Sequence, residues 1–384
     1  MTRTADVVIV GGGIVGASVG YHLMERDPHL SVVLIEREAE VGTGATAKAT
    51  GGVRFQFSTE TNVRLSQLSY RYFTDAEAML GATVDFVAHG YLFVTGDAAT
   101  MARSREAATL QRGLGVPTEV LAPADAGRHL AALRTDDLVG ATFCADDGSA
   151  DPYSLLRVFL ERARDHGMEV LVWQSANGLL RDGDRVVGVR TITERYESPV
   201  VIDCAGPHAH EVAALAGVDV PSRPYRRQVM VTEPLPGLPD TFPLIVDLDT
   251  GFYVHRQGRS AVLMGGTDKD IAPGHDTTVD WDAFAAVQAA AARRVPPMAE
   301  ARVMRAYAGV RDLTPDYHGI LDAVPGAPGL YVACGFSGHG FMHSPAIGRL
   351  MAELVLDGQA SSLDIAPLSL ARFAGALRAE ANMF

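Results

Sequence analysis

The most constraining feature of this sequence is a glycine-rich turn that directly follows a short apolar run. The run Val7–Val10 is apolar and β-branched, which predicts a buried parallel strand. Gly11, Gly13 and Gly16 follow at the spacing GxGxxG, and residues 14–24 have the composition of a helix. In such a unit the first glycine permits a tight turn, the second lets the backbone approach a pyrophosphate, and the third lets the helix pack closely on the strand. The sequence therefore predicts a dinucleotide site at its beginning.

The residues after this turn strengthen the prediction, because a lone GxGxxG is weak. A second strand is predicted at 31–35, and it ends in Glu36, the expected acceptor for a ribose hydroxyl. Two alternatives are a glycine-rich turn of another α/β protein and a signal peptide, since Arg3 precedes the apolar run. Three consecutive glycines and the charged segment Glu25–Asp27 argue against the signal peptide.

Composition limits the classes of partner. The 384 residues are enough for about two domains. The formal net charge of −13 disfavours nucleic acid and anionic membrane surfaces as partners, and we find no apolar run long enough to span a membrane. Cys144, Cys204 and Cys334 lie far apart, with neither metal-ligand nor disulfide spacing, which favours a reducing, cytoplasmic location.

The order of predicted elements indicates a nucleotide-binding domain with an insertion. We assign residues 1–82, 146–218 and 317–384 to the nucleotide domain, and 83–145 and 219–316 to the second domain. Besides 14–24, helices are expected at 59–80 (with Ser58 as N-cap), 98–112, 123–130, 152–165, 280–295 and 344–356. Further strands are expected at 91–95, 139–144, 170–173, 185–191, 200–204, 229–232, 244–247, 252–255, 261–265, 301–310 and 330–334.

A second glycine loop lies near the end of the sequence. The expected strand 330–334 leads into Gly335–Gly340 and then into a helix. Two such loops at opposite ends of the chain favour a ligand long enough to reach both, and FAD is such a ligand. A helix N-terminus beside the flavin would stabilise its anionic reduced form. A plain βα turn is the alternative for this loop, and the loop itself disfavours an NAD enzyme without flavin.

At this point the sequence resembles a known family, the D-amino-acid oxidase or glutathione-reductase-2 class of FAD amine oxidoreductases. The resemblance covers almost the whole chain and rests on residues 8–16, 202–207, 309–316 and 334–341. Within the class, the β subunits of sarcosine oxidase and of dye-linked L-proline dehydrogenase look most similar, the latter through residues 51–57.

The resemblance implies an α/β fold, with a Rossmann-like FAD-binding domain and an inserted α+β substrate domain on a mixed, mainly antiparallel sheet. It also implies oxidation of a small amino or imino acid of the sarcosine, proline, glycine or D-amino acid type. Hydride would move from the carbon next to the substrate nitrogen to flavin N5, and water would hydrolyse the resulting imine.

The loop chemistry and the resemblance together predict the cofactor contacts, which come from several distant segments. They are Gly11, Gly13, Ile14, Val15, Gly16, Glu36, Arg37, Thr43, Ala45, Thr46, Lys48, Ala49, Thr50, Gly51, Gly52, Ala176, Cys204, Ala205, Gly206, Arg311, Gly335, Phe336, Ser337, Gly338, His339, Gly340, Phe341 and Met342.

Four side chains are predicted to act on the substrate. A carboxylate prefers a planar bidentate cation, so Arg311 is the first choice and Arg54 the second. Both match substrate arginines of the resembled family. The alternative is a structural ion pair, with Asp312 next to Arg311. Tyr253 and His255 lie two apart on one strand and share a face, and a buried core histidine is the alternative for His255.

Three departures from the resembled family refine this prediction. Monomeric sarcosine oxidases of the resembled family attach FAD to a cysteine in this region. Residues 305–310 hold no cysteine, so FAD is expected to bind non-covalently. Residues 148–150 hold no histidine for a second, covalent flavin. Residues 261–264 hold no lysine to promote reaction with oxygen, which favours a dehydrogenase slightly over an oxidase.

The electron acceptor therefore stays open between oxygen, a dye and a partner flavoprotein, and a heteromeric partner subunit is possible. A second class of function also stays open: a flavoprotein assembly factor or electron-transfer subunit without turnover of its own.

Overall fold

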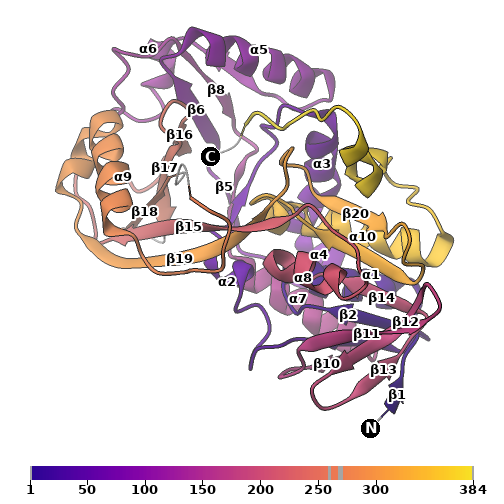
Figure 1. Ribbon diagram of the computed structural model, residues 1–384. Helices are drawn as coiled ribbons and strands as arrows, with labels where there is room; N and C mark the ends of the chain where they lie inside the picture. Colours follow the sequence, from indigo (N-terminus) through magenta and orange to yellow (C-terminus); the bar gives the residue numbers. More distant parts are fainter. Residues whose placement is uncertain (1, 258–260, 267–270, 383–384) are drawn as a thin grey trace.

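The lower lobe of the molecule is built on a sheet of short apolar strands. The structure is a computed structural model that describes residues 2–257, 261–266 and 271–382 (Figure 1). The strand order in this six-stranded sheet is β10–β3–β2–β14–β21–β20, and all neighbours are parallel except β20 and β21. The strands are β2 (Val7–Val10), β3 (Val32–Ile35), β10 (Glu169–Leu171), β14 (Val200–Asp203), β20 (Ile320–Ala323) and β21 (Leu330–Cys334).

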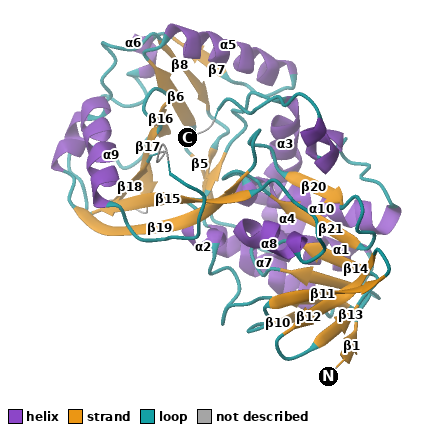
Figure 2. Cartoon of the chain, viewed as in Figure 1, coloured by secondary structure: helices purple, strands orange, loops and turns teal. Residues whose placement is uncertain are grey.

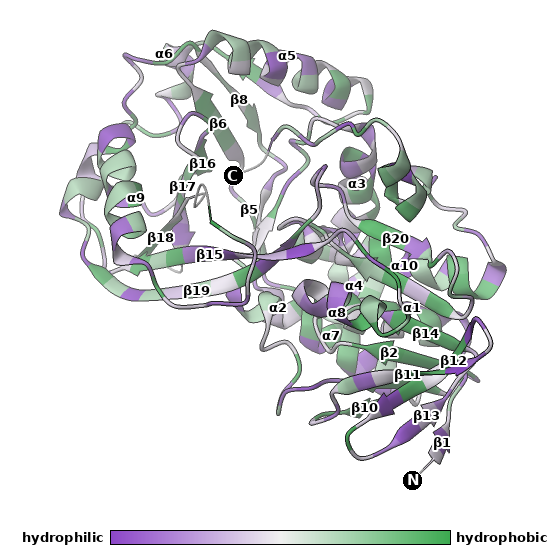
Figure 3. Cartoon of the chain, in the orientation of Figure 1, coloured by the Kyte–Doolittle hydropathy of each residue, from purple (hydrophilic) through white to green (hydrophobic). Residues whose placement is uncertain are grey.

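Helices cover one face of this sheet, and a smaller sheet covers the other. Side chains of Val7 and Ile9 pack in one cluster with the helices, whereas Val8 and Val10 pack in another with the smaller sheet. Figure 3 shows the central strands as largely hydrophobic, as burial on both faces requires. The helices are α1 (Ile14–Arg26), α3 (Glu60–Thr74), α4 (Ala76–Leu80), α7 (Pro152–Asp165) and α10 (Gly340–Asp357); the smaller sheet contains β1 (Thr2–Thr4), β13 (Arg195–Glu197), β12 (Arg185–Thr191) and β11 (Ala176–Asp182).

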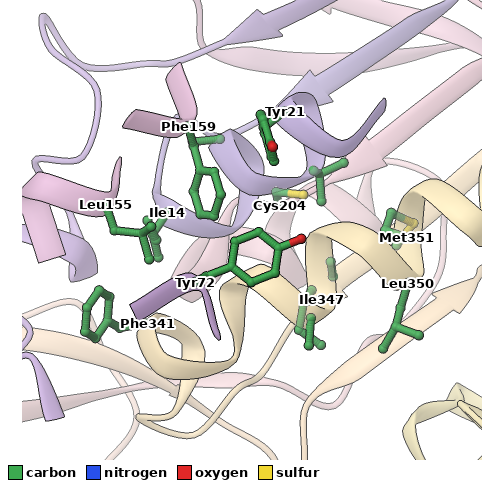
Figure 4. Close-up of a cluster of buried hydrophobic side chains, with 14 of the residues drawn as sticks. Ile14, Tyr21, Tyr72, Leu155, Phe159, Cys204, Phe341, Ile347, Leu350 and Met351 are labelled. Atoms are coloured by element: carbon green, nitrogen blue, oxygen red, sulfur yellow. The ribbon is translucent and has the colours of Figure 1, made fainter. Parts of the chain in front are cut away.

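Helix α1 from the first part of the chain and helix α10 from the last part pack together in this helical layer. A Cβ at Gly348 of α10 would lie 2.6 Å from the backbone of Ser18 in α1, so glycine allows the two helices to approach closely. The Ser18 hydroxyl donates to the Ser344 carbonyl oxygen at 2.7 Å. Figure 4 shows the surrounding cluster, in which Tyr21, Phe159 and Ile347 come from three different helices. The N-terminal nucleotide unit and the C-terminal helix therefore form one core.

The upper lobe is an eight-stranded sheet with helices on its outer side (Figures 1 and 2). Its order is β19–β15–β18–β17–β16–β6–β8–β7, and only β6 and β16 pair in parallel. The strands are β6 (Tyr91–Thr95), β7 (Glu119–Leu121), β8 (Gly140–Cys144), β15 (Arg223–Thr232), β16 (Leu244–Asp247), β17 (Phe252–Gln257), β18 (Ala261–Gly265) and β19 (Val303–Leu313); the helices include α5 (Ala98–Gly113), α6 (Pro123–Ala126) and α9 (Trp281–Arg294).

Two long strands and several short elements lie between the lobes. The long strands β15 and β19 pair from Arg223↔Leu313 to Thr232↔Val303 and run from the upper lobe toward the lower one. A three-stranded sheet contains β4 (Gly52–Val53), β9 (Gly148–Ala150) and β5 (Phe86–Ala88). The remaining short helices are α2 (Ala45–Lys48), α8 (Ala209–Ala214), η1 (Gly206–His208), η2 (Pro296–Glu300), η3 (Ala366–Leu368) and η4 (Leu370–Ala374).

The predicted fold class is confirmed. The predicted domain boundaries stay a proposal, supported by the sheets: every strand of the six-stranded sheet falls within the first set of segments, and every strand of the eight-stranded sheet within the second. Strand β5 crosses the proposed boundary by pairing with β9. No helix in the described part of the chain combines the length and apolar character that crossing a bilayer requires.

Several predicted elements were wrong in their limits. The single helix expected at 59–80 is broken at Asp75 into α3 and α4. The N-cap of α3 is Thr59 rather than Ser58, because the backbone N–H and the hydroxyl of Ser58 both donate to Glu380. Strand β11 is not among the predicted strands, since it lies between those expected at 170–173 and 185–191.

Three further limits differ. The strand expected to 173 ends at Leu171, since Trp173 has a φ of 57°. The strand expected at 301–310 continues to Leu313. Helix α10 starts at Gly340 rather than Ser344. It continues through Pro345 because the Phe341 carbonyl, which proline cannot satisfy, accepts the Ser344 hydroxyl at 2.9 Å.

Candidate cofactor and substrate site

A single cavity of about 870 Å³ contains most of the predicted site. Its walls come from the glycine turn, residues 36–38, the loop 42–54, residues 174–176 and 204–212, the end of β19 and the start of α10. The predicted residues that line it are Gly11, Gly13, Ile14, Val15, Glu36, Arg37, Thr43, Ala45, Thr46, Lys48, Ala49, Thr50, Gly51, Gly52, Arg54, Ala176, Cys204, Ala205, Gly206, Arg311, Phe336, Gly338, His339, Gly340, Phe341 and Met342.

Three predicted contact residues shape the walls from behind and do not line the cavity. Gly16 packs on Gly11, and a Cβ there would lie 2.1 Å from the Gly11 carbonyl oxygen. The backbone N–H of Gly335 donates to Asp312 Oδ2 at 2.6 Å, and the Ser337 hydroxyl donates to the Gly335 carbonyl oxygen at 3.0 Å. These residues hold the two glycine loops in shape.

The glycine turn has the geometry that a pyrophosphate requires. Gly11 has a φ of +109°, and a Cβ at this position would lie 2.5 Å from the Cys204 carbonyl oxygen. Only glycine fits here, so the backbone N–H groups at the start of α1 border the cavity. The Ile14 N–H donates to Thr46 Oγ1 at 3.0 Å, which attaches the small-residue loop to the turn.

The predicted ribose acceptor is fixed by the backbone. Glu36 follows β3 and accepts from the Gly12 N–H at 2.7 Å with Oε2 and from the Glu38 N–H at 2.9 Å with Oε1. The carboxylate therefore has a defined orientation at the cavity wall, 24 residues after the turn that it contacts.

At the other end of the cavity, Arg311 lies against the terminal glycine loop. A Cβ at Gly338 would lie 3.1 Å from Arg311 Nη1, so this glycine leaves room for the guanidinium. Asp312 follows on β19 and points to the opposite face, where it binds the Gly335 N–H. Burial raises the pKa of the Asp312 carboxyl to about 6, although the Gly335 hydrogen bond opposes this. Asp312 therefore anchors the loop, and this geometry does not favour the alternative of an Arg311–Asp312 pair.

Arg54 lines the cavity but is surrounded by structural contacts. Its Nη1 donates to the Gln56 carbonyl oxygen at 2.6 Å, and its Nη2 donates to the Asn382 carbonyl oxygen at 2.8 Å. The guanidinium carbon lies 4.1 Å from the centre of the Phe57 ring. Burial lowers the pKa of Arg54, although nearby Glu380 opposes this shift. These contacts favour the structural alternative over direct substrate binding.

Tyr253 and His255 share the inner face of β17, but neither lines the cavity. Tyr253 covers Gly265, where a Cβ would lie 2.3 Å from the Tyr253 hydroxyl oxygen. His255 Nδ1 contacts the Arg256 carbonyl oxygen at 2.9 Å, and the His255 ring stacks with that of His89 at 6.4 Å. Burial lowers the pKa of His255 to about 4. This geometry places His255 in the core rather than on the cavity wall, but its buried Nε2 has no hydrogen-bond partner among the described residues, so its hydrogen bonds are not satisfied there.

Sequence reasoning missed two contributors to this end of the cavity. Tyr91 lines the cavity, and its hydroxyl oxygen lies so close to Gly52 that a Cβ there would be only 2.0 Å from it. Burial raises the pKa of the Tyr91 hydroxyl. The C-terminal segment binds the loop that carries Arg54, through Glu380 and Asn382. The double glycine 51–52 was the available signal for Tyr91, and no local pattern indicated the C-terminal segment.

The N-terminus of α10 completes the cavity with an uncharged, positively polarised wall. His339 is the N-cap of α10, and burial together with the neighbouring Arg54 lowers its pKa far below the usual value. Burial likewise lowers the pKa of His343 to about 3. Both imidazoles are therefore neutral near pH 7, and the positive charge at this end belongs to Arg311, Arg54 and the helix terminus.

Together, a Rossmann-like lobe and a second sheet around one cavity indicate a dinucleotide-binding oxidoreductase. Residues 6–354 match the family described as FAD dependent oxidoreductase, and the chain belongs to that family. The family predicted from the sequence is thus confirmed.

Among curated proteins, the chain is 30% identical to FAD-dependent oxidoreductase domain-containing protein 1 of Xenopus laevis, over 96% of this chain and 82% of that protein. It is 27% identical to the mitochondrial sarcosine dehydrogenase of Mus musculus, over 94% of this chain but only 40% of that protein.

Two solved structures share the fold. L-proline dehydrogenase from P. horikoshii superposes with a TM-score of 0.91 and 27% identity, covering 98% of this chain and 100% of that chain. Glycine oxidase from Geobacillus kaustophilus superposes with a TM-score of 0.85 at 24% identity, covering 96% of this chain and 99% of that chain.

The residues present fit FAD. The Gly11 turn leaves a cradle that a side chain would fill, Glu36 is oriented for a ribose hydroxyl, and the cavity reaches from this turn to the N-terminus of α10. An anionic pyrophosphate suits the first end, and the negative charge of a reduced flavin would suit the second.

Proposed function

We propose that this protein oxidises the C–N bond of a small amino or imino acid of the sarcosine, proline, glycine or D-amino acid type. One observation carries the proposal: Arg311 lies against Gly338 at the start of α10, in the same cavity as the pyrophosphate turn. A permanently charged fork at this end suits a substrate carboxylate. The names of relatives, sarcosine dehydrogenase and L-proline dehydrogenase, point to the same substrate class.

In this proposal Arg311 binds the carboxylate and fixes the orientation of the substrate. FAD held by the Gly11 turn and the start of α10 would supply a hydride acceptor for the carbon next to the substrate nitrogen. The chain contributes a buried, water-poor wall of Tyr91, Phe336 and Phe341 around the reacting carbon. The N-terminus of α10 favours negative charge developing beside it. Water then hydrolyses the imine product.

We further propose that FAD is held non-covalently, since residues 305–310 carry no cysteine. The lean toward a dehydrogenase stays part of the proposal, because β18 offers no lysine at 261–264. The electron acceptor would then be a dye-like mediator or a partner flavoprotein rather than oxygen. A heteromeric partner subunit is part of this proposal. The buried free thiols Cys144, Cys204 and Cys334 support the cytoplasm as the proposed compartment.

A second candidate function is a flavoprotein that assists a complex without turnover of its own. One observation favours it: a relative that is 24% identical over 97% of this chain is named pyruvate dehydrogenase phosphatase regulatory subunit, mitochondrial. In that case Arg311 and Arg54 would serve only the structure.

An anaerobic substrate panel separates the two candidates. Purified yellow protein is mixed with sarcosine, proline, glycine and D-amino acids, and the visible flavin band is followed. We expect at least one compound to bleach the band. The rate at which air re-oxidises the reduced flavin is then compared with the rate for a dye, and this comparison distinguishes an oxidase from a dehydrogenase. A colourless protein, or a band unchanged by the whole panel, would refute the enzymatic proposal.

A further inference from the structure

Three side chains with no part in the proposed chemistry converge where the two lobes meet at the cavity rim. His208 ends η1, Glu211 lies on α8, and His275 lies in the segment 271–280 that precedes α9. His208 Nδ1 lies 3.1 Å from Glu211 Oε2, and His275 Nε2 lies 2.9 Å from Glu211 Oε1. One potential ligand atom from each residue lies within 4.8 Å of the other two.

The segment that carries His275 is held in place by β15. The Gly274 N–H donates to the Pro224 carbonyl oxygen at 2.8 Å. Arg226, two residues further along β15, forms ion pairs with Asp276 at 3.4 Å and Asp280 at 3.2 Å. The inserted lobe therefore presents His275 to the cofactor lobe from a fixed base.

The two imidazoles are arranged around the carboxylate. The rings of His208 and His275 stack with centroids 3.9 Å apart and planes within 3°. A third ring, that of His210, lies 6.2 Å from His275, and its Nε2 is 4.0 Å from Glu211 Oε1. His210 Nδ1 is buried and has no hydrogen-bond partner among the described residues.

This set of donors selects one class of ligand. Two imidazole nitrogens and a carboxylate suit borderline first-row divalent ions such as Zn²⁺, whereas Ca²⁺ and Mg²⁺ prefer oxygen-only sites. Both nitrogens already point at the carboxylate. A metal ion would replace the protons that they share with it. The two stacked rings would turn apart so that each nitrogen lone pair points at the ion, at a zinc–nitrogen distance of about 2.0–2.1 Å.

We propose that His208, Glu211 and His275 bind one divalent transition-metal ion of the Zn²⁺ type, with water or His210 in the fourth position. The ion joins the cofactor lobe to the inserted lobe at the rim of the cavity. Its role is structural, so no electron transfer is assigned to it, and the site is independent of the proposed oxidation. The competing interpretation is a metal-free cluster in which Glu211 accepts a hydrogen bond from each histidine.

Calorimetry on the FAD-loaded protein tests the site. After treatment with a chelator and its removal, the protein is titrated with Zn²⁺, and one ion per chain is expected. Loss of an outer-sphere partner typically weakens metal binding about 10–100-fold, so loss of a ligand should cost at least about 100-fold. We expect that loss in Glu211→Gln and His275→Ala. His29→Ala, which removes an exposed histidine far from the cluster in sequence, should bind as the unaltered protein does.

A second measurement needs no variant. With Cu²⁺ in place of Zn²⁺, the electron paramagnetic resonance spectrum of the unaltered protein should show coupling to two imidazole nitrogens. Absence of saturable binding at one equivalent, unchanged binding in both ligand variants, or a copper spectrum with oxygen ligands alone would overturn the proposal. FAD content and the metal-free unfolding midpoint of each variant show whether it has folded.

Discussion

The two ends of the cavity are built in different ways. At the pyrophosphate end, the wall is a continuous piece of backbone from Gly11 to Val15, with Glu36 bound to Gly12. At the substrate end, the wall gathers Arg54, Tyr91 and Arg311 from positions far apart in the sequence. The first end is therefore encoded locally and the second only by the complete fold. Substitutions at the two ends should separate cofactor binding from substrate binding.

The largest effect is expected at the local end. Gly16→Val would place a Cβ 2.1 Å from the Gly11 carbonyl oxygen, where only backbone can move, so the turn cannot keep its shape. We expect no soluble FAD-loaded protein, measured by yield and flavin content. Gly113→Ala is the control, because Gly113 lies on α5 outside the cavity and no atom lies within 4 Å of its Cβ position. A Gly16→Val protein with full flavin content would remove the structural basis of the pyrophosphate site.

The next largest effect is expected at the substrate end. Arg311→Leu should lower kcat/KM for carboxylate substrates about a hundredfold, or about 3 kcal/mol, through loss of charged hydrogen bonds, with FAD retained. Arg311→Lys keeps the charge but not the fork, so an intermediate loss is expected. Arg305→Leu is the control on the same strand, because Arg305 is exposed and does not line the cavity. Equal kinetics in the Arg311 and Arg305 variants would contradict the assignment.

The same contrast explains what the sequence could predict. The strand at 7–10, the glycine turn and the helix that starts at residue 14 follow from local spacing, and the structure has them as expected. Glu36 lies at the cavity wall beside the turn, and its role as acceptor for the ribose stays a prediction. Tyr91 was indicated only by the double glycine 51–52 that it covers. The C-terminal residues Glu380 and Asn382 could not be predicted, because their contacts join segments separated by up to 328 residues.

Two predictions about histidine and arginine show the same limit. The sequence shows the residue type at each position but not the partners of the side chain. Arg54 proved to be bound by backbone carbonyls and Phe57, and His255 to be buried behind the cavity wall. Residue type alone cannot distinguish a substrate cation from a structural one, since both satisfy a charge in a buried environment.

The C-terminal attachment tests whether the nonlocal end depends on remote contacts. Glu380 is buried and accepts from the N–H and hydroxyl of Ser58, from the side chains of Thr59 and Asn62, and from the Asn382 N–H. Glu380→Gln should lower the free energy of unfolding by about 1–3 kcal/mol and loosen the part of the cavity wall that Arg54 forms, since Arg54 donates to the Asn382 carbonyl oxygen. Glu60→Gln, an exposed i,i+4 partner of Arg64, should cost no more than about 0.5 kcal/mol.

This attachment also has a pH signature. Burial alone would raise the pKa of Glu380, but the hydrogen bonds from Ser58 and Asn382 outweigh it and lower the pKa below the ordinary value of 4.5. A lowered folded-state pKa contributes stability that is present above the unfolded pKa and lost as the pH falls through the folded one. Denaturant unfolding between neutral pH and about pH 3 should therefore show a loss in the unaltered protein that is smaller in Glu380→Gln. Parallel curves would contradict this role.

The smallest effect returns to the local end and sharpens the comparison. Glu36→Gln keeps a hydrogen-bond acceptor for the ribose but removes the charge that also receives the Gly12 and Glu38 N–H groups. We expect FAD to bind about fivefold more weakly, a loss of about 1 kcal/mol, with kcat unchanged once the site is saturated. Flavin fluorescence on titration of the apoprotein measures the affinity, and Glu40→Gln, an exposed carboxylate outside the cavity, is the control. Two results would contradict this division of the cavity: a lower kcat of Glu36→Gln at saturating FAD, together with weaker binding of FAD in Arg311→Leu. The cofactor end and the proposed substrate end would then not be separable.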